Sequence, residues 1–120
     1  MRRLAVAMLG LMMLFATAGC GSAPAEPIDS QAVVIDVRTP SEFAEGHLEG
    51  AVNIDLQSES FASQIAELPV EGSYVVYCRS GNRSAQATQL MREAGFEQVV
   101  DAGGVQAAAD RTGLSVVTGG

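Results

Sequence analysis

The stretch from Tyr74 to Gly95 constrains the fold of this 120-residue chain most strongly. Its beginning, residues 74–77, combines β-branched and aromatic side chains and predicts a short buried strand. Further along, apolar residues recur at the i, i+3, i+4 and i+7 spacing of one helix face, and Gly95 can end that helix; they are Ala87, Leu90, Met91 and Ala94. Cys78 therefore lies where a strand passes into the N-terminus of a helix.

The residues after Cys78 favour a negatively charged sulfur. They are Arg79, Ser80, Gly81, Asn82, Arg83 and Ser84. None is proline, so every backbone N–H is available to point inward, and the helix dipole favours negative charge at this place. The two arginines add fixed positive charges, and a cysteine in such a field loses its proton easily. Burial statistics alone would favour an inert core cysteine, but such a residue needs no flanking cations.

The remaining segments alternate between strand and helix patterns. Residues 32–37 form a nearly continuous apolar run, typical of a strand covered on both faces. Thr39, Pro40 and Glu42 form a capping box with proline at the first helical position, which predicts a short helix ending at Gly46. We expect further strands at 51–54 and 98–100 and a helix from about Ser58 that ends before Pro69. The alternation predicts an α/β fold with a mostly parallel central sheet flanked by helices.

The C-terminal segment gives weaker signals. Gly103 and Gly104 predict a turn, residues 105–110 a helical turn, and residues 114–117 a strand or an ordered tail. In parallel sheets ligands bind at the carboxyl ends of the strands, which is where Cys78 is expected.

The N-terminus has the layout of an exported protein. Arg2 and Arg3 precede a fifteen-residue apolar run that is too short to span a membrane as a helix. Residues 17–20 resemble the lipobox of bacterial lipoproteins, in which the signal peptide is cut before a cysteine that carries the lipid. We expect a signal peptide at 1–19, lipidated Cys20 and a flexible tether at 20–29, and one domain at 30–118. Gly21 is not the inner-membrane retention residue aspartate, so we expect the periplasmic face of the outer membrane in a Gram-negative cell. An uncleaved anchor or plain secretion are the alternatives.

Charge excludes nucleic acid as a partner. The chain has seven arginines, no lysine and fourteen acidic residues, and two of the arginines lie in the leader. No basic face can be built from the other five.

If Cys20 is acylated, Cys78 has no disulfide partner among the two cysteines of the chain, and a free thiol in an oxidising compartment favours a chemical role. No cluster of His, Cys, Asp and Glu has the spacing of metal ligands, so we expect no metal and no cofactor.

Three blocks in order resemble a single-domain rhodanese, the thiosulfate sulfurtransferase family. Residues 36–43 with 46–54 are similar to the N-terminal signature, 77–84 to the active-site loop, and 103–105 to the C-terminal glycine pair. The resemblance covers about residues 30 to 117. One departure is Ala108, where the family often has tryptophan, which puts the packing near the C-terminus in doubt.

The resemblance implies a ping-pong sulfur transfer. Cys78 would take the outer sulfur of a small anionic donor such as thiosulfate as a persulfide, and a thiol or cyanide-like acceptor would remove it. The amides of the loop would hold the negative sulfur, and Arg79 and Arg83 would orient the donor. Asp36 and Arg38 match the Asp-x-Arg motif and are expected either to organise the loop side of the sheet or to form a structural ion pair. His47, the only histidine, falls in a turn that is structural in the family.

Other functions share this type of loop. Phosphatases and arsenate reductases place an arginine after five intervening residues, where this chain has Ser84, and Arg83 comes one position too early. A tethered persulfide carrier that passes sulfur to a partner protein has the same loop as the enzyme, so it remains open. An inactive interaction domain commonly lacks the cysteine.

Overall fold

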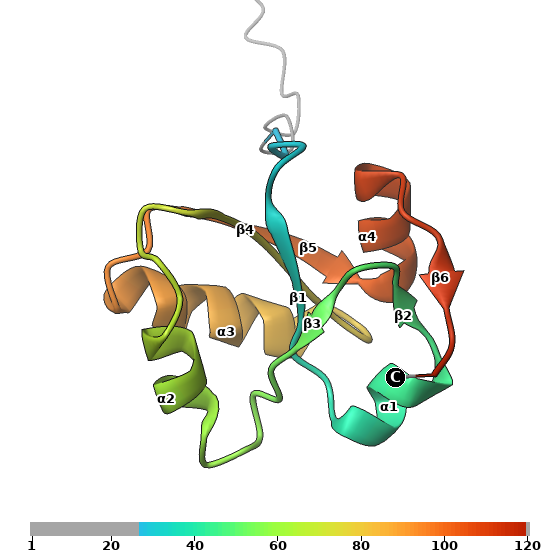
Figure 1. Cartoon of the computed structure of the whole chain (residues 1–120), viewed down its shortest axis with the longest axis horizontal. Coiled ribbons are helices and arrows are strands. Elements are labelled where there is room, and N and C mark those ends of the chain that lie inside the picture. The colour runs from blue at the N-terminus through green and yellow to red at the C-terminus, as the bar shows by residue number, and fades with distance from the viewer. Residues whose placement is uncertain (1–26, 120) are drawn as a thin grey trace, which may run out of the picture.

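The centre of the fold is a four-stranded parallel sheet with the strand order β3-β1-β4-β5 (Figure 1). The computed structural model describes residues 27–119. The strands β2 and β6 form a separate two-stranded antiparallel sheet. In chain order the elements are β1 (Val33–Asp36), α1 (Pro40–Glu45), β2 (His47–Leu48), β3 (Val52–Asn53), α2 (Phe61–Ala66), β4 (Ser73–Cys78), α3 (Asn82–Glu93), β5 (Gln98–Gly104), α4 (Val105–Thr112) and β6 (Val116–Val117). The α/β class and the mostly parallel sheet predicted from the sequence are confirmed.

Two apolar clusters cover the two faces of the sheet. Alternate residues of β4 divide between them, because successive side chains of a strand point to opposite faces. Tyr74, Val76 and Cys78 belong to the cluster on the side of α2 and α3, whereas Val75 and Tyr77 belong to the cluster that includes Ala108 of α4. Burial on both faces explains why this strand reads as a continuous apolar run.

The helix after Cys78 begins as predicted but buries a different stripe. Its buried residues are Ser84, Ala87, Thr88 and Met91, whereas Leu90 is 38% exposed and Ala94 is also exposed. Leu90 and Ala94 were expected to share one helix face with Ala87 and Met91, but they are not buried with them. Both residues instead line a hollow of about 380 Å³ together with Phe61 and Ile65 of α2.

Three further segments differ from the sequence predictions. The helix expected from Ser58 begins at Phe61. The turn expected at Gly103 and Gly104 is wrong, because β5 continues through both glycines after a register irregularity at Val76 and Tyr77 of β4. The predicted helical turn at 105–110 is a full helix, α4. Residues 116–117 form a strand, the first of the two alternatives considered for the C-terminal segment.

Ala108, the departure noted in the sequence, belongs to the apolar cluster on the α4 side of the sheet. Its side chain is fully buried and packs in the cluster of Leu48, Tyr77 and Ala102. The large Tyr77 ring, itself fully buried, lies in the same cluster. Within residues 27–119, no helix is long and apolar enough to cross a membrane. The predicted leader and Cys20 lie outside the described residues.

Candidate active site

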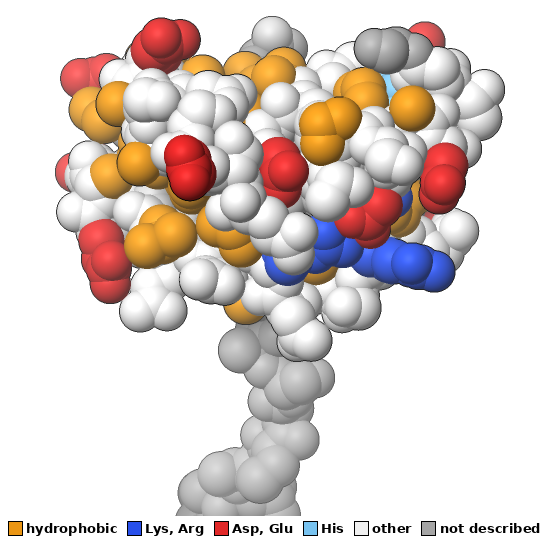
Figure 2. All heavy atoms as spheres, turned by 90° about the horizontal axis from the view of Figure 1, so that it is seen from below, with side chains coloured by type: hydrophobic (Ala, Val, Ile, Leu, Met, Phe, Trp, Pro, Cys, Tyr) orange, Lys and Arg blue, Asp and Glu red, His pale blue; other side chains and the backbone are white. Residues whose placement is uncertain are grey.

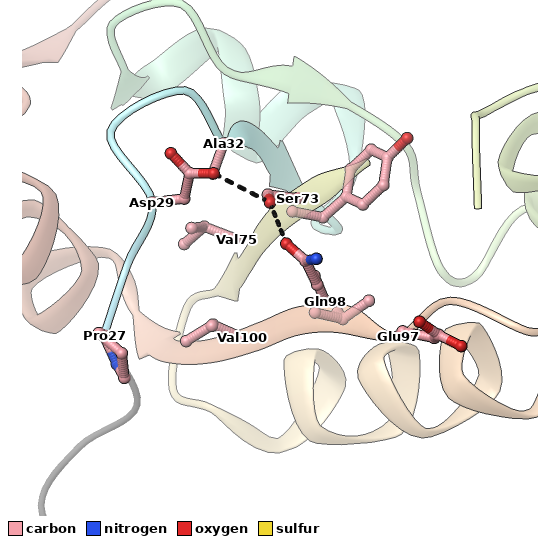
Figure 3. Close-up of a pocket in the computed structure, with 10 residues that line it drawn as sticks. Pro27, Asp29, Ala32, Ser73, Val75, Glu97, Gln98 and Val100 are labelled. Atoms are coloured by element: carbon pink, nitrogen blue, oxygen red, sulfur yellow. Dashed lines mark hydrogen bonds between the residues drawn. The ribbon is translucent and has the colours of Figure 1, made fainter. Parts of the chain in front are cut away.

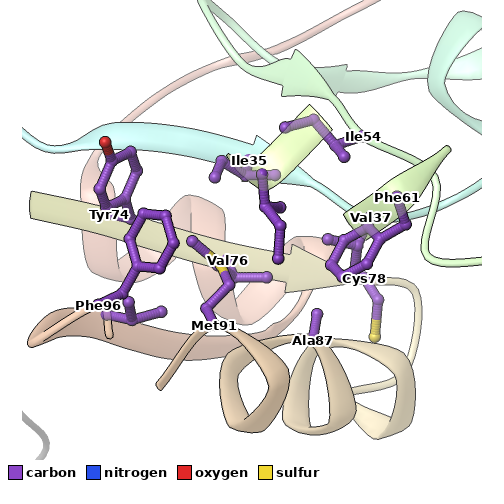
Figure 4. Packing of buried hydrophobic residues seen from close by; sticks show 12 residues of the cluster. Ile35, Val37, Ile54, Phe61, Tyr74, Val76, Cys78, Ala87, Met91 and Phe96 are labelled. Carbon is purple, nitrogen blue, oxygen red and sulfur yellow. The ribbon is translucent and has the colours of Figure 1, made fainter. Parts of the chain in front are cut away.

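Cys78 is the last residue of β4, and its side chain lies on the face of the sheet that α2 and α3 cover. Its side chain is fully buried, and Figure 4 shows the sulfur directed away from the apolar cluster toward the α3 ribbon. The parallel register places Cys78 beside Gly104 of β5. The thiol therefore stands at the carboxyl end of the central strands, as predicted for a ligand site.

Hydrogen bonds from the loop converge on the sulfur. The backbone N–H of Gly81 donates to Cys78 Sγ at 2.9 Å. The Cys78 thiol donates to the Ser84 hydroxyl oxygen at 3.5 Å, and that hydroxyl donates in turn to the Gly81 carbonyl at 3.0 Å. Gly81 is the N-cap of α3 and offers no side-chain acceptor. The sulfur thus takes the place of the acceptor that a helix N-terminus requires.

This arrangement acidifies the thiol. Burial raises the pKa of Cys78, but hydrogen bonds outweigh burial, and the net pKa lies below that of an ordinary cysteine. The groups that lower the pKa are the Ser84 hydroxyl and the backbone N–H groups of Ser84, Gly81 and Ser80. For the hydroxyl to stabilise the thiolate, its single proton has to turn from the Gly81 carbonyl to the ionised sulfur. Charged acceptors make stronger hydrogen bonds than neutral ones, so these groups favour the thiolate.

Two glycines make the tight loop possible. Gly81 has φ +103°, a left-handed conformation that favours glycine. Gly104 has an ordinary φ of −78°, but a Cβ there would stand 2.6 Å from the Arg79 carbonyl oxygen. The loop therefore lies directly on the end of β5, which gives the second residue of the glycine pair a steric role.

The side chains of the loop separate into two groups. Ser84 is buried against the sulfur, whereas Arg79, Ser80 and Asn82 are exposed. Arg83 does not stand free, because its guanidinium forms a bidentate ion pair with Glu42 of α1, at 2.7 and 2.8 Å. Hydrogen bonds from Arg83 are the main reason that the pKa of Glu42 falls to about 2. Sequence reasoning assigned Glu42 only to the capping box, which the structure confirms, and missed its partner.

Asp36 and Arg38 form a buried ion pair behind the loop. Arg38 donates from Nη2 to Asp36 Oδ2 at 2.7 Å and from Nε to Oδ1 at 3.0 Å. Its guanidinium also lies 5.7 Å from the centre of the Tyr77 ring. Asn53 of β3, which sequence reasoning missed, donates to the backbone carbonyls of both Asp36 and Arg38. The structure places the pair in the supporting framework and not in contact with the sulfur.

The contacts of His47 are with Phe43 and not with the sulfur of Cys78. It is buried in β2, its Nδ1 lies 2.8 Å from the Phe43 carbonyl oxygen, and its ring stacks on Phe43 with centroids 3.6 Å apart. A structural role, as the sequence suggested, accounts for these contacts.

The surface seen in Figure 2 has one group of basic side chains, and a cavity lies at the end of the sheet opposite to the loop. In Figure 2 basic side chains gather in one group with acidic side chains beside them. A cavity of about 250 Å³ is lined by residues at the opposite, amino end of β4. There the Ser73 hydroxyl lies within hydrogen-bonding distance of Asp29 and Gln98 (Figure 3). Within the described residues no group of three or more His, Cys, Asp and Glu side chains could hold a metal ion.

Known proteins are similar to this chain in both sequence and fold. The model of the Rhodanese-like domain family matches residues 24–109. Thiosulfate sulfurtransferase PspE of Escherichia coli is 35% identical over 72 residues, covering 60% of this chain and 69% of its own. A protein named sulfurtransferase from Allochromatium vinosum is 33% identical over 85 residues, covering 71% and 78%.

Solved structures give the same result. A rhodanese with anions from E. coli superposes with a TM-score of 0.61 at 32% identity, covering 73% of this chain and 99% of that one. The Alr3790 protein from Anabaena superposes with a TM-score of 0.64 at 28% identity, covering 73% and 78%. The fold, the cysteine loop and the family match together show that this chain belongs to the rhodanese-like family.

Proposed function

We propose that the protein is a sulfurtransferase that carries sulfane sulfur on Cys78. In the first step the Cys78 thiolate attacks the outer sulfur of thiosulfate. The new S–S bond forms as the bond to the SO₃ group breaks, and sulfite leaves with that electron pair. In the second step an acceptor such as cyanide attacks the outer sulfur of the persulfide, forms thiocyanate and returns the thiolate. Covalent catalysis divides one difficult transfer into two displacements.

The observation that carries this proposal is the donation of the Gly81 N–H to the sulfur at 2.9 Å. With the Ser84 hydroxyl and two more amides, it favours a negative sulfur before the reaction. The persulfide places its negative charge one atom further out, toward the same loop. Preorganised donors that serve both states lower the barrier without rearrangement, as in an oxyanion hole.

Phosphatase chemistry is disfavoured by the state of Arg83. A phosphate ester needs an arginine whose paired N–H groups grip the oxyanion. In this protein those groups bind Glu42. The loop amides remain, and they suit a single sulfur atom.

Steady-state turnover of thiosulfate with cyanide tests the proposal. We expect thiocyanate to accumulate over many turnovers with the natural protein and not with Cys78→Ser. A single turnover per protein molecule, with no cycling on cyanide or small thiols, would indicate a persulfide carrier that needs a protein acceptor. No sulfur uptake would refute both functions.

We also propose that the domain is exported and anchored by lipid on Cys20, facing the periplasm. The support is the short apolar leader after two arginines and the residues before that cysteine. Membrane fractionation with the mass of the N-terminal peptide tests it. The expected peptide begins at a diacylated Cys20, and an unprocessed N-terminus or a free Cys20 would contradict the anchor.

A further inference from the structure

The ion pair between Glu42 and Arg83 joins α1 to the first turn of the helix that follows the cysteine. Arg83 Nη1 donates to Glu42 Oε1 at 2.7 Å and Nη2 donates to Oε2 at 2.8 Å. The two side chains are 23% and 22% exposed. Both oxygens of the carboxylate and both terminal nitrogens of the guanidinium are therefore committed to each other.

Glu42 is fixed independently of Arg83. Its Oε1 accepts hydrogen bonds from the Thr39 backbone N–H and hydroxyl, at 3.3 and 3.1 Å. These bonds belong to the capping box that begins α1. The carboxylate is thus held in position by its own helix, and Arg83 meets it from α3.

The pair changes the charge around the sulfur. Arg83 directly precedes Ser84, whose hydroxyl lies beside the sulfur. The Asp36–Arg38 pair nearby is also neutral as a unit. Of the two loop arginines, only the exposed Arg79 has no side-chain partner among residues 27–119. An approaching anion therefore meets one uncompensated cation and the helix N-terminus, where the loop sequence alone would provide two cations.

We propose that Glu42 is a specificity-determining residue, which cancels the charge of Arg83 and so reduces the preference of the loop for doubly charged sulfur donors over singly charged ones. This inference rests on the proposed sulfur transfer. The substrate class that benefits is the singly charged sulfane donor, such as a thiosulfonate anion. Such a donor passes its outer sulfur to the thiolate, and a sulfinate leaves with the electron pair of the broken S–S bond.

Glu42→Gln removes the negative charge of this side chain and keeps the hydrogen bonds that begin α1. Glutamine also satisfies a capping box, so α1 keeps its N-terminal hydrogen bonds while the ion pair is lost. Glu45→Gln is the matched control, because Glu45 lies exposed on the same helix and its carboxylate has no hydrogen-bond or ion-pair partner among residues 27–119. The probes are thiosulfate, a dianion, and methanethiosulfonate, a monoanion. The readout is the second-order rate of sulfur loading on the Cys78 peptide, measured by mass spectrometry on the full chain.

The gains in loading rate that Glu42→Gln gives for the two donors should be related to each other. Coulomb's law doubles the interaction free energy when the charge doubles, so the gain for thiosulfate is the square of the gain for methanethiosulfonate. At low ionic strength we expect Glu42→Gln to load about fourfold faster from thiosulfate and about twofold faster from methanethiosulfonate. Arg83→Gln, which leaves Glu42 unpaired, should shift the ratio in the opposite direction. Both shifts should shrink in high salt.

A second readout needs no sulfur transfer. Alkylation of Cys78 by anionic iodoacetate, relative to neutral iodoacetamide, should rise in Glu42→Gln and stay unchanged in Glu45→Gln. Unchanged donor and alkylation ratios in Glu42→Gln, or an equal gain in Glu45→Gln, would overturn the inference. If neither donor loads the natural protein while the alkylation ratio still rises, the proposed function fails and the control of charge by Glu42 stands.

Discussion

Removing the Ser84 hydroxyl should make Cys78 a weaker acid. The hydroxyl is fully buried and lies 3.5 Å from the sulfur, within reach of a thiolate that burial would otherwise destabilise. A hydrogen bond to a charged group contributes about 1.5–3 kcal/mol, and the long contact favours the lower end of that range. Since one pKa unit corresponds to about 1.4 kcal/mol, Ser84→Ala should raise the pKa of Cys78 by about one unit. At any pH below the pKa values of both proteins, sulfur loading should then slow about tenfold.

The thiolate absorbance in the ultraviolet, followed against pH in a Cys20→Ser background, measures this pKa directly. Ser80→Ala is the matched control, because the Ser80 side chain is exposed and only its backbone N–H contributes to the lowered pKa. The control should leave the titration unchanged. A thermal melt verifies that Ser84→Ala is folded. If the folded variant titrates within about 0.3 units of the parent, the hydroxyl is not one of the groups that acidify the thiol.

Three further perturbations have defined outcomes. Gly104→Ala places a Cβ 2.6 Å from the Arg79 carbonyl oxygen, so it should displace the loop, cost about 1–3 kcal/mol in chemical unfolding and slow sulfur loading; an unaffected loading rate would refute the steric role of this glycine. Asp36→Ala leaves the buried Arg38 unpaired and should destabilise the fold by about 3–5 kcal/mol in urea unfolding, whereas a loss below about 1 kcal/mol would contradict a buried pair. The folded-state pKa of Glu42 is about 2 against an ordinary 4.5, so Glu42 stabilises the fold above pH 4.5 and loses that contribution as the pH falls toward 2. Over this range the free energy of unfolding of the natural protein should fall by about 1–2 kcal/mol more than that of Glu42→Gln. Parallel curves of stability against pH for the two proteins would count against the ion pair.

Local signals in the sequence predicted the fold well. The capping box at Thr39 and Glu42 depends on residues three apart, and the structure has it as predicted. The strand before Cys78 and the helix after it follow from short patterns in the same way. These features were predictable because neighbouring residues determine them.

Features that depend on partners distant in sequence were missed. Arg83 and Glu42 are 41 residues apart, and nothing local distinguishes a paired arginine from one that binds an anion. The polar members of the buried stripe of α3 were not predicted. Ser84 and Thr88 can be buried because their hydroxyls donate within the helix turn, to the Gly81 and Ala85 carbonyls. Small polar residues that are satisfied in this way can occupy core positions that a hydrophobic pattern assigns to leucine.

The most direct test of the account is the intact mass of the protein after treatment with thiosulfate and removal of excess reagent. We expect a mass increase of one sulfur atom, located on the peptide that contains Cys78, reversed by cyanide and absent in Cys78→Ser. An unchanged mass, or sulfur on Cys20 with Cys78 unmodified, would contradict the claim that the loop amides hold Cys78 ready to accept sulfur.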